Sequence, residues 1–243
     1  MYFTEKVLIT RTGRFRENDL WVRFLSPSKG MLTGFAFGGC KSRRRFCGCL
    51  DCLNLVLFRV SLSSRGRYLV LEEGTLVHGY QRLKNNPSRV GMAVNGLRFV
   101  QKICLEGDDS ENVFRLMLAY LQTVEESEQV PAFFPILFRA AILFSHGFEP
   151  NLSRCFFCGK KLENIAQPSF LFAQGTIACP GCDTRHEKSI RVRRDSLLFL
   201  SRLNASNPES WLKWSIEPDI LRDSIQVVES FTDYHLGKQF NTK

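Results

Sequence analysis

Two Cys-x-x-Cys pairs constrain this chain more than any other feature of its sequence. Cys155 and Cys158 form the first pair, Cys179 and Cys182 form the second, and 20 residues separate the pairs. This spacing is typical of a zinc ribbon, in which each pair presents two thiolates to one metal ion. Because four thiolates fill a tetrahedral site, the sequence predicts a structural Zn²⁺ with no open position for a substrate. Unligated thiols, a redox pair and His186 as a spare ligand are the alternatives.

A second group of cysteines lies in the first third of the chain. Its members are Cys40, Cys47, Cys49 and Cys52. They do not form two Cys-x-x-Cys pairs, so we expect small or exposed thiols here, with a second metal as the less favoured alternative. The chain has nine cysteines and no apolar leader after its first residues. We therefore expect a reducing, cytoplasmic location.

Length and composition indicate a globular protein. The chain has 243 residues, 44% of them hydrophobic, which is enough to bury a sizeable core. Its longest apolar stretch, residues 132–144, is interrupted by Pro135 and Arg139 and is shorter than the roughly 18 residues of a membrane span. A soluble protein is therefore expected.

The net charge of +9 is concentrated at one end. Residues 1–80 hold 13 basic and 6 acidic residues, a balance of +7, which leaves +2 for residues 81–243. A basic excess on one module is the electrostatic signature of a nucleic-acid-binding surface. A basic surface that serves only solubility is the alternative.

The first third of the chain has the alternation of β-strands. Leu20, Val22 and Phe24 alternate with Trp21 and Arg23, and similar patterns predict strands over residues 6–11, 20–24, 31–37, 53–62 and 68–71. Five strands with glycine-rich bends in about 75 residues are typical of a small closed barrel. We therefore expect an N-terminal OB-fold.

Beyond residue 74 the apolar residues recur at helical spacing. Helices are expected near residues 90–104, 113–124, 133–146, 195–203 and 219–236. Gly147 is expected to end the third of these helices. The predicted fold class is therefore α+β, with an OB-fold β-barrel followed by an α-helical domain that carries an inserted four-cysteine zinc module. The predicted domains are a basic nucleic-acid-binding barrel (1–79), the first part of the helical domain (80–150), the zinc module (151–190) and the rest of the helical domain (191–243).

Cations and aromatic residues are interleaved in the predicted barrel. The candidate nucleic-acid-binding residues are Arg11, Arg14, Arg16, Arg23, Lys41, Arg43, Arg44, Arg45, Arg65 and Arg67. Phe15, Trp21, Phe35 and Phe37 lie among them, and single-strand binders stack bases on such rings. We expect most of these four rings to fill the barrel core and a minority to meet bases.

The sequence offers little for catalysis. Its four histidines are scattered, and it contains no nucleophile elbow, phosphate-binding loop or His-Glu-x-x-His element. The acidic pairs Asp108-Asp109 and Glu125-Glu126 flank a predicted helix, where solvated end positions explain them. We therefore expect no enzyme and no catalytic residues.

Short segments in both halves of the chain occur in a familiar order. In the first half they are Val7-Leu8-Ile9, Glu17-Asn18-Asp19, Lys29-Gly30 and Lys41-Ser42-Arg43-Arg44-Arg45. In the second half they are Phe138-Arg139, His146-Gly147-Phe148-Glu149-Pro150 and Tyr234-His235-Leu236-Gly237-Lys238. Over nearly the whole chain this order resembles the RecO family of bacterial recombination mediators, whose terminal element is His-Leu-Gly-Arg. The chain departs from the family at Ser42, where glycine is frequent, and in the cysteines around Cys49.

The resemblance implies an OB-fold, a helical domain and, in many members, an inserted four-cysteine zinc module. It also implies a non-enzymatic role in DNA repair and recombination through the RecF pathway. Implied activities are binding of single- and double-stranded DNA and annealing of complementary strands. Implied partners are RecR, the acidic C-terminal tail of single-stranded DNA-binding protein and, indirectly, RecA.

Two other functions share some of these features. A zinc-ribbon RNA-binding or transcription accessory protein would have the same barrel and metal, but would prefer RNA and would not anneal DNA. A metal-dependent nuclease would need an open metal position and an acidic cluster, and would cleave DNA in magnesium.

Overall fold

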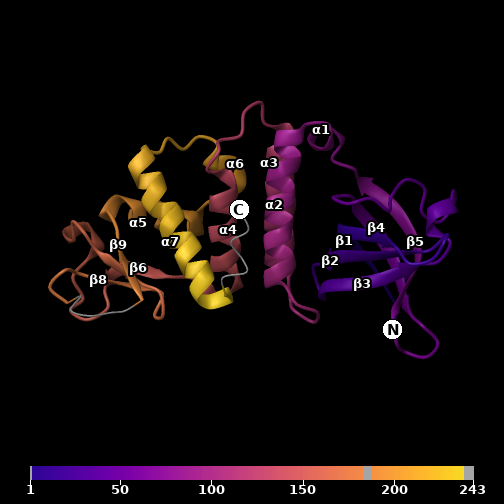
Figure 1. The fold of residues 1–243 in the computed structure, drawn as a ribbon, viewed down its shortest axis with the longest axis horizontal. Coiled ribbons are helices and arrows are strands. Elements are labelled where there is room, and N and C mark those ends of the chain that lie inside the picture. Colours follow the sequence, from indigo (N-terminus) through magenta and orange to yellow (C-terminus); the bar gives the residue numbers. More distant parts are fainter. Residues whose placement is uncertain (1, 183–187, 238–243) are drawn as a thin grey trace. The chain divides into compact units, whose positions relative to one another are not determined.

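The computed structural model describes residues 2–182 and 188–237 of the chain. The chain divides into two compact units, Met1–Ser127 and Glu128–Lys243, and each unit is described by itself. Figure 1 shows a first part built of strands followed by helices, which confirms the predicted mixed α+β class. Within the described residues, no helix is both long enough and apolar enough to cross a membrane.

Five strands form the sheet of the first unit. They are β1 (Tyr2–Arg14), β2 (Leu20–Ser26), β3 (Gly30–Ala36), β4 (Leu55–Leu62) and β5 (Leu69–His78). The strands pair in the order β1-β2-β3-β5-β4, and β4 pairs back with β1, so that the sheet closes on itself. All pairs are antiparallel except β3 and β5. The seam between β3 and β5 is short, because only Gly34 with Leu69 and Phe35 with Val70 pair across it.

The interior of the closed sheet is filled by alternate side chains of its strands. Phe24 of β2 and Phe58 of β4 are fully buried, with ring centroids 5.6 Å apart. Gly74 of β5 leaves space for Phe58 and Cys49, because a Cβ at this position would lie 2.7 Å from the Phe58 ring and 2.8 Å from the Cys49 sulfur. The core therefore depends on a glycine that the alternation alone does not identify.

All five predicted strands are present, and the first, second and fifth are longer than predicted. β1 begins at Tyr2 because residues 2–8 pair with β4, and β5 continues to His78 because it pairs with the same strand. Leu53 was expected inside the fourth strand, but its φ of 67° places it in the left-handed region, and β4 begins at Leu55.

Helices complete the first unit. They are the 3-10 turn η1 (Gly39–Lys41), which lies between β3 and β4, and α1 (Gln81–Lys84), α2 (Pro87–Ile103) and α3 (Glu111–Glu126). Asn86 caps α2 by accepting hydrogen bonds from the backbone N–H groups of Ser88 and Arg89. The two long helices lie where the 3.6-residue period predicted them.

Glu125 corrects one expectation. The solvated helix end predicted for it is wrong, because the residue is only 6% exposed. Its carboxylate accepts a hydrogen bond of 3.1 Å from the backbone N–H of Arg82 and lies 2.6 Å from His78 Nε2. One buried carboxylate thus connects β5, α1 and α3, which satisfies its charge away from water.

The second unit combines helices with a small sheet. Its elements are α4 (Phe134–Leu143), η2 (Phe144–Phe148), β6 (Asn151–Cys155), η3 (Leu162–Asn164), β7 (Ser169–Leu171), β8 (Thr176–Ala178), β9 (Ser189–Arg191), α5 (Arg194–Ser201), η4 (Arg202–Ala205), α6 (Pro208–Trp211) and α7 (Pro218–Leu236). The four short strands, which the sequence pattern did not predict, pair in the order β6-β8-β7-β9.

The helices of the second unit pack on one another through aromatic and ionic contacts. The Trp211 ring is fully buried and lies 5.5 Å from the Phe134 ring of α4. Arg193, just before α5, donates to the carboxylates of Asp219 and Asp223 of α7 at 3.0 and 2.8 Å. Gly147, with φ of 92°, ends the α4–η2 segment as its position predicted.

Candidate metal centre and nucleic-acid interface

The small sheet of the second unit brings the two cysteine pairs together. Cys155 is the last residue of β6, Cys179 follows β8, and these two strands pair in parallel with Cys155 opposite Ile177. The four sulfur atoms lie within 4.8 Å of one another. Cys155 and Cys179 are buried, whereas Cys158 is exposed and Cys182 is half-buried. Two loops that follow paired strands thus meet as a four-sulfur cluster.

The geometry of this cluster fits a tetrahedral metal. With metal–sulfur bonds of about 2.3 Å, a tetrahedral zinc site has sulfurs about 3.8 Å apart. The sulfurs of Cys158 and Cys179 are 3.7 Å apart. The backbone N–H of Cys179 donates to the Cys155 sulfur at 3.3 Å, and Gly159 takes the left-handed φ of 71° directly after the first pair. The N–H donor favours a thiolate at Cys155, and the left-handed Gly159 lets the chain turn directly after Cys158.

The close packing of the four sulfurs shifts the pKa values of Cys155 and Cys182 in opposite directions. Burial raises the pKa of Cys155, but hydrogen bonds from the backbone of Cys158, Cys179 and Phe157 outweigh it and lower the pKa to about 6. In contrast, the neighbouring sulfurs of Cys179 and Cys158 raise the pKa of Cys182 to about 12. Four thiolates this close cannot all be charged unless a cation shares the site, and a divalent metal ion would supply it. The alternative ligand His186 lies outside the described residues.

The first-unit cysteines do not form such a cluster. In the parts of the chain that the structure describes, the four cysteines of the second unit form the one group of three or more potential metal ligands. Cys49 points its sulfur at the backbone oxygen of Gly74 at 3.5 Å, and Cys52 points its sulfur at that of Thr10 at 3.3 Å. Cys40 and Cys47 are exposed. The favoured expectation of small and exposed thiols is thus what the structure shows.

Residues 38–45, here called the basic loop, lie in the connection between β3 and β4. The loop is fixed to the turn before β2, because the Gly38 N–H donates to the Asp19 carboxylate at 2.7 Å and the Cys40 N–H donates to the Asn18 carbonyl at 3.0 Å. Ser42 accepts a hydrogen bond of 3.1 Å from the Arg45 N–H. The serine that departs from the family pattern therefore caps the turn that carries the cations.

The four cations of the basic loop do not have the same role. Arg45 donates through its guanidinium to the Phe37 carbonyl, and that guanidinium lies 5.2 Å from the centroid of the buried Phe46 ring. Lys41, Arg43 and Arg44 are exposed, and within the described residues none of the three forms an ion pair. Arg45 therefore holds the loop, and the other three cations are free to bind phosphates.

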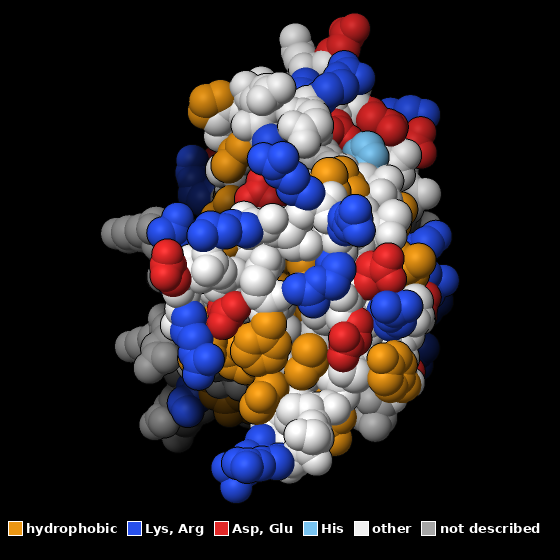
Figure 2. Space-filling view, turned by 90° about the vertical axis from the view of Figure 1, so that its right-hand side faces the viewer, with side chains coloured by type: hydrophobic (Ala, Val, Ile, Leu, Met, Phe, Trp, Pro, Cys, Tyr) orange, Lys and Arg blue, Asp and Glu red, His pale blue; other side chains and the backbone are white. Residues whose placement is uncertain are grey.

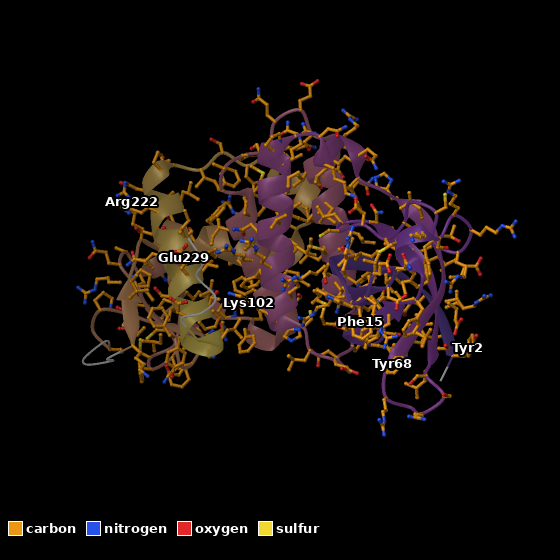
Figure 3. The ribbon with its side chains drawn as sticks, turned by 45° about the vertical axis from the view of Figure 1, so that its right-hand side comes forward. Tyr2, Phe15, Tyr68, Lys102, Arg222 and Glu229 are labelled. Carbon is orange, nitrogen blue, oxygen red and sulfur yellow. The ribbon has the colours of Figure 1, made fainter. Side chains whose placement is uncertain are left out.

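Next to the basic loop lies a group of rings on the outside of the sheet, here called the aromatic face. Its members are Phe15, Trp21, Phe35, Phe37 and Tyr68. Phe35 is at its centre, with ring centroids 4.9 Å from Phe15, 6.3 Å from Phe37 and 5.5 Å from Tyr68. Figure 3 shows Phe15 and Tyr68 on the same side of the first unit. The expectation that most of these rings fill the barrel is wrong, because none of them belongs to its core.

Cations surround the aromatic face. The Arg16 guanidinium lies 5.2 Å from the centroid of the Phe15 ring, and that of Arg11 lies 5.7 Å from the Trp21 ring. Arg11 and Arg23 are direct neighbours across β1 and β2. Arg14 ends β1, and Arg65 and Arg67 lie in the turn before Tyr68. The fold thus places Arg11 and Arg16 against rings of this face and Arg23 beside Arg11, while Arg65 and Arg67 precede Tyr68 along the chain.

Figure 2 shows the outside of the first unit, with hydrophobic side chains gathered on part of the surface and Lys and Arg around them. Phe15 is 49% exposed and Tyr68 is 42% exposed. Exposed rings between cations provide stacking surfaces for unpaired bases and positive charge for phosphates. Tyr68 was not predicted as a site residue, although its position directly after Arg65 and Arg67 was a signal that could have found it.

Comparison with known proteins gives a consistent result over both units. Residues 1–80 match the family described as Recombination protein O N terminal, and residues 84–243 match the family described as Recombination protein O C terminal. The DNA repair protein RecO of Oleidesulfovibrio alaskensis is 40% identical to this chain over 237 residues, which cover 98% of the chain and 96% of that protein. The RecO proteins of Maridesulfovibrio salexigens and Lawsonia intracellularis are 38% and 34% identical with the same coverage.

Proposed function

The chain belongs to the RecO family of DNA repair and recombination proteins, and from this premise we propose that it is a recombination mediator. It binds single- and double-stranded DNA and anneals complementary strands. It acts with RecR to load RecA on DNA covered by single-stranded DNA-binding protein, whose acidic C-terminal tail it contacts. These partners place its work at the nucleoid. It uses binding rather than covalent chemistry.

The observation that carries this proposal is the aromatic face beside the basic loop. Unpaired bases stack on exposed rings with about 1 to 3 kcal/mol per base, whatever their sequence. Phe15, Phe35 and Tyr68 provide such rings, while Lys41, Arg43 and Arg44 provide charge for the backbone. A sequence-independent mediator needs this combination, because it must act wherever DNA is damaged.

Annealing follows from the same charges. Two single strands repel each other through their phosphates, and cations that bind both backbones lower this repulsion. The surface then releases the bases to pair with each other, since stacked base pairs are more stable than bases on isolated rings. No nucleotide is needed for this step. The sheet order, closed through β4 and β1, supports the assignment of the barrel as an OB-fold.

The metal has a structural role in this proposal. Cys155, Cys158, Cys179 and Cys182 would hold Zn²⁺, since four thiolates form a closed site that suits this ion. When bound, the ion joins the two loops that follow β6 and β8 and so holds the small sheet together. For the domains we propose a barrel (1–79), a helical domain (80–150 and 191–243) and the zinc module (151–190).

Removal of three cations tests the DNA site. The variant Lys41→Ala/Arg43→Ala/Arg44→Ala should reduce the slope of log affinity for single-stranded DNA against log salt by about 2, because each phosphate contact contributes about 0.7. The control Arg82→Ala/Arg98→Ala/Arg115→Ala removes the same charge from α1, α2 and α3 of the same unit. Equal slopes for the two variants would show that the basic loop does not bind DNA.

A second experiment tests annealing. Two complementary fluorescent oligonucleotides, coated with single-stranded DNA-binding protein, should pair faster when this protein is added without nucleotide. The triple variant of the basic loop should lose the acceleration. Tight binding without acceleration, or a preference for RNA over DNA of the same sequence, would favour the RNA-binding or transcription accessory function instead.

A further inference from the structure

The first cysteine pair carries a surface that metal binding does not require. Phe156 and Phe157 occupy the two positions between Cys155 and Cys158, and they are 60% and 49% exposed. Their ring centroids are 5.2 Å apart, with an angle of 84° between the rings. The second cysteine pair has Pro180 and Gly181 at the same two positions. Two large rings at these positions are therefore not a consequence of the metal-binding loop.

The exposure of the two rings is unfavourable for the isolated protein. Burial of a phenylalanine side chain stabilises a folded protein, and a ring that stays about half exposed to water loses part of this contribution. The metal ligands need only sulfur atoms and backbone N–H groups at this place. The rings thus cost stability, which a binding role would explain.

Cations flank these rings. Arg154 and Lys161 are partners in an isolated antiparallel bridge, and the Lys160 carbonyl accepts a hydrogen bond of 2.8 Å from the Cys155 N–H. All three cations are exposed, and residues 150–162 contain no Asp or Glu. Among the described residues none of these cations forms an ion pair. Two like charges opposite each other are unfavourable unless an anion binds them.

We propose that Arg154, Phe156, Phe157, Lys160 and Lys161, here called the knuckle patch, bind single-stranded nucleic acid as a second contact, separate from the barrel. Bases that leave a duplex can stack on the two rings, and the three cations bind the phosphates between them. The proposal goes beyond the barrel site and gives the zinc module a binding role in addition to its structural one.

The charge of the patch favours this occupant over a protein. Lysine is depleted at the centre of protein–protein interfaces, whereas rings interleaved with cations are typical of surfaces that bind single strands. The metal site itself would carry a formal charge of about −2 and would attract nearby cations. That attraction accounts for the lysines but not for the exposed rings.

The test uses the full-length, metal-loaded protein and three variants. Phe156→Ala/Phe157→Ala removes the rings, Lys160→Glu/Lys161→Glu reverses two charges, and Arg202→Glu/Lys213→Glu reverses two exposed charges elsewhere in the same unit. Fluorescence anisotropy with a labelled oligothymidine measures affinity, and elemental analysis measures zinc per chain. The first two variants should each weaken binding by about tenfold, and the third should leave it unchanged.

Photo-crosslinking locates the contact independently. An oligonucleotide that contains 5-iododeoxyuridine should crosslink to the peptide with Phe156 and Phe157 as well as to peptides of the first unit. Unchanged affinity in the zinc-loaded ring and charge variants, or crosslinks confined to residues 1–127, would overturn the proposal. A change in self-association without a change in DNA affinity would also overturn it. If the ring variant loses zinc, the charge variant decides.

Failure of this proposal can be distinguished from failure of the barrel site. The triple variant of the basic loop should keep residual binding that the Phe156→Ala/Phe157→Ala substitutions remove. If the basic-loop variant binds DNA as the parent does, the proposed function fails, and the knuckle-patch variants still report on their own surface.

Discussion

Two cysteine-rich segments of this protein differ in whether their sulfur atoms form a cluster. Residues 40–52 contain four cysteines, and so does the segment from residue 155 to residue 182. In the second segment the four sulfurs converge within 4.8 Å of one another. In the first, Cys49 is buried in the barrel core and Cys40 and Cys47 face solvent. Cysteine density alone therefore says little about metal binding.

The difference lies in what faces each Cys-x-x-Cys pair. Cys49 and Cys52 have this spacing too, but their neighbours are the backbone oxygens of Gly74 and Thr10, which offer no further thiolate. Cys155 and Cys158 face a second pair, because β6 and β8 are paired and each leads into a cysteine loop. A metal site thus needs two such loops that the fold brings together.

The largest effect is expected from loss of one metal ligand. Cys179→Ser should abolish stoichiometric zinc and expose the amides of β6, β7 and β8 to hydrogen exchange. The three- to five-residue strands cannot hold the module alone, and zinc binding supplies on the order of 10 kcal/mol to such modules. The matched variant Cys52→Ser should keep full zinc. Full zinc in both proteins would contradict the metal assignment.

Thiol reactivity provides the next contrast. Burial raises the pKa of Cys49 to about 11, so at pH 8 its thiolate fraction is about 100-fold below that of an ordinary exposed cysteine. Among the cysteines of residues 40–52, alkylation by iodoacetamide should label Cys40 and Cys47 first and Cys49 last, and Cys49 should gain reactivity as the pH rises toward 11. Mass spectrometry of the labelled peptides measures the order, and equal rates at pH 8 would show that the barrel does not protect Cys49.

The conformation of the basic loop should depend on Arg45 and not on a metal ion. Arg45→Ala removes the hydrogen bond to Phe37 and the contact with Phe46. We expect a loss of about 1 to 2 kcal/mol in the free energy of unfolding of the first unit, measured with urea. A chelator should not change that transition. If Arg45→Ala leaves stability intact but weakens DNA binding as much as the triple variant does, Arg45 binds DNA directly.

The smallest effect is expected from the exposed cysteines. Cys40→Ser/Cys47→Ser should change the free energy of unfolding by less than about 0.5 kcal/mol, because neither side chain is buried. Zinc content and DNA affinity should stay the same. A lower zinc content would restore the alternative of a second metal in the first unit.

The strand and helix pattern could be predicted because it depends on neighbours in the sequence. Alternation in residues 20–24 is a local property, and so is the period of 3.6 residues in α2 and α3. The role of Glu125 could not be predicted, since its hydrogen bonds go to the backbone of Arg82 and to His78, more than 40 residues away. The sequence also could not show that Phe35 and Phe37 lie outside the barrel core, because alternation does not tell which face of a strand meets the core.

The spacing of Cys155, Cys158, Cys179 and Cys182 determined by itself that two thiolate pairs could share one metal, because each pair is set by four consecutive residues. Only the tertiary structure decided that Cys49 fills the barrel, that Arg45 holds its loop and that Phe15, Phe35 and Tyr68 meet on one face. Burial and contact depend on which distant segment the fold places alongside, and no local pattern contains that information.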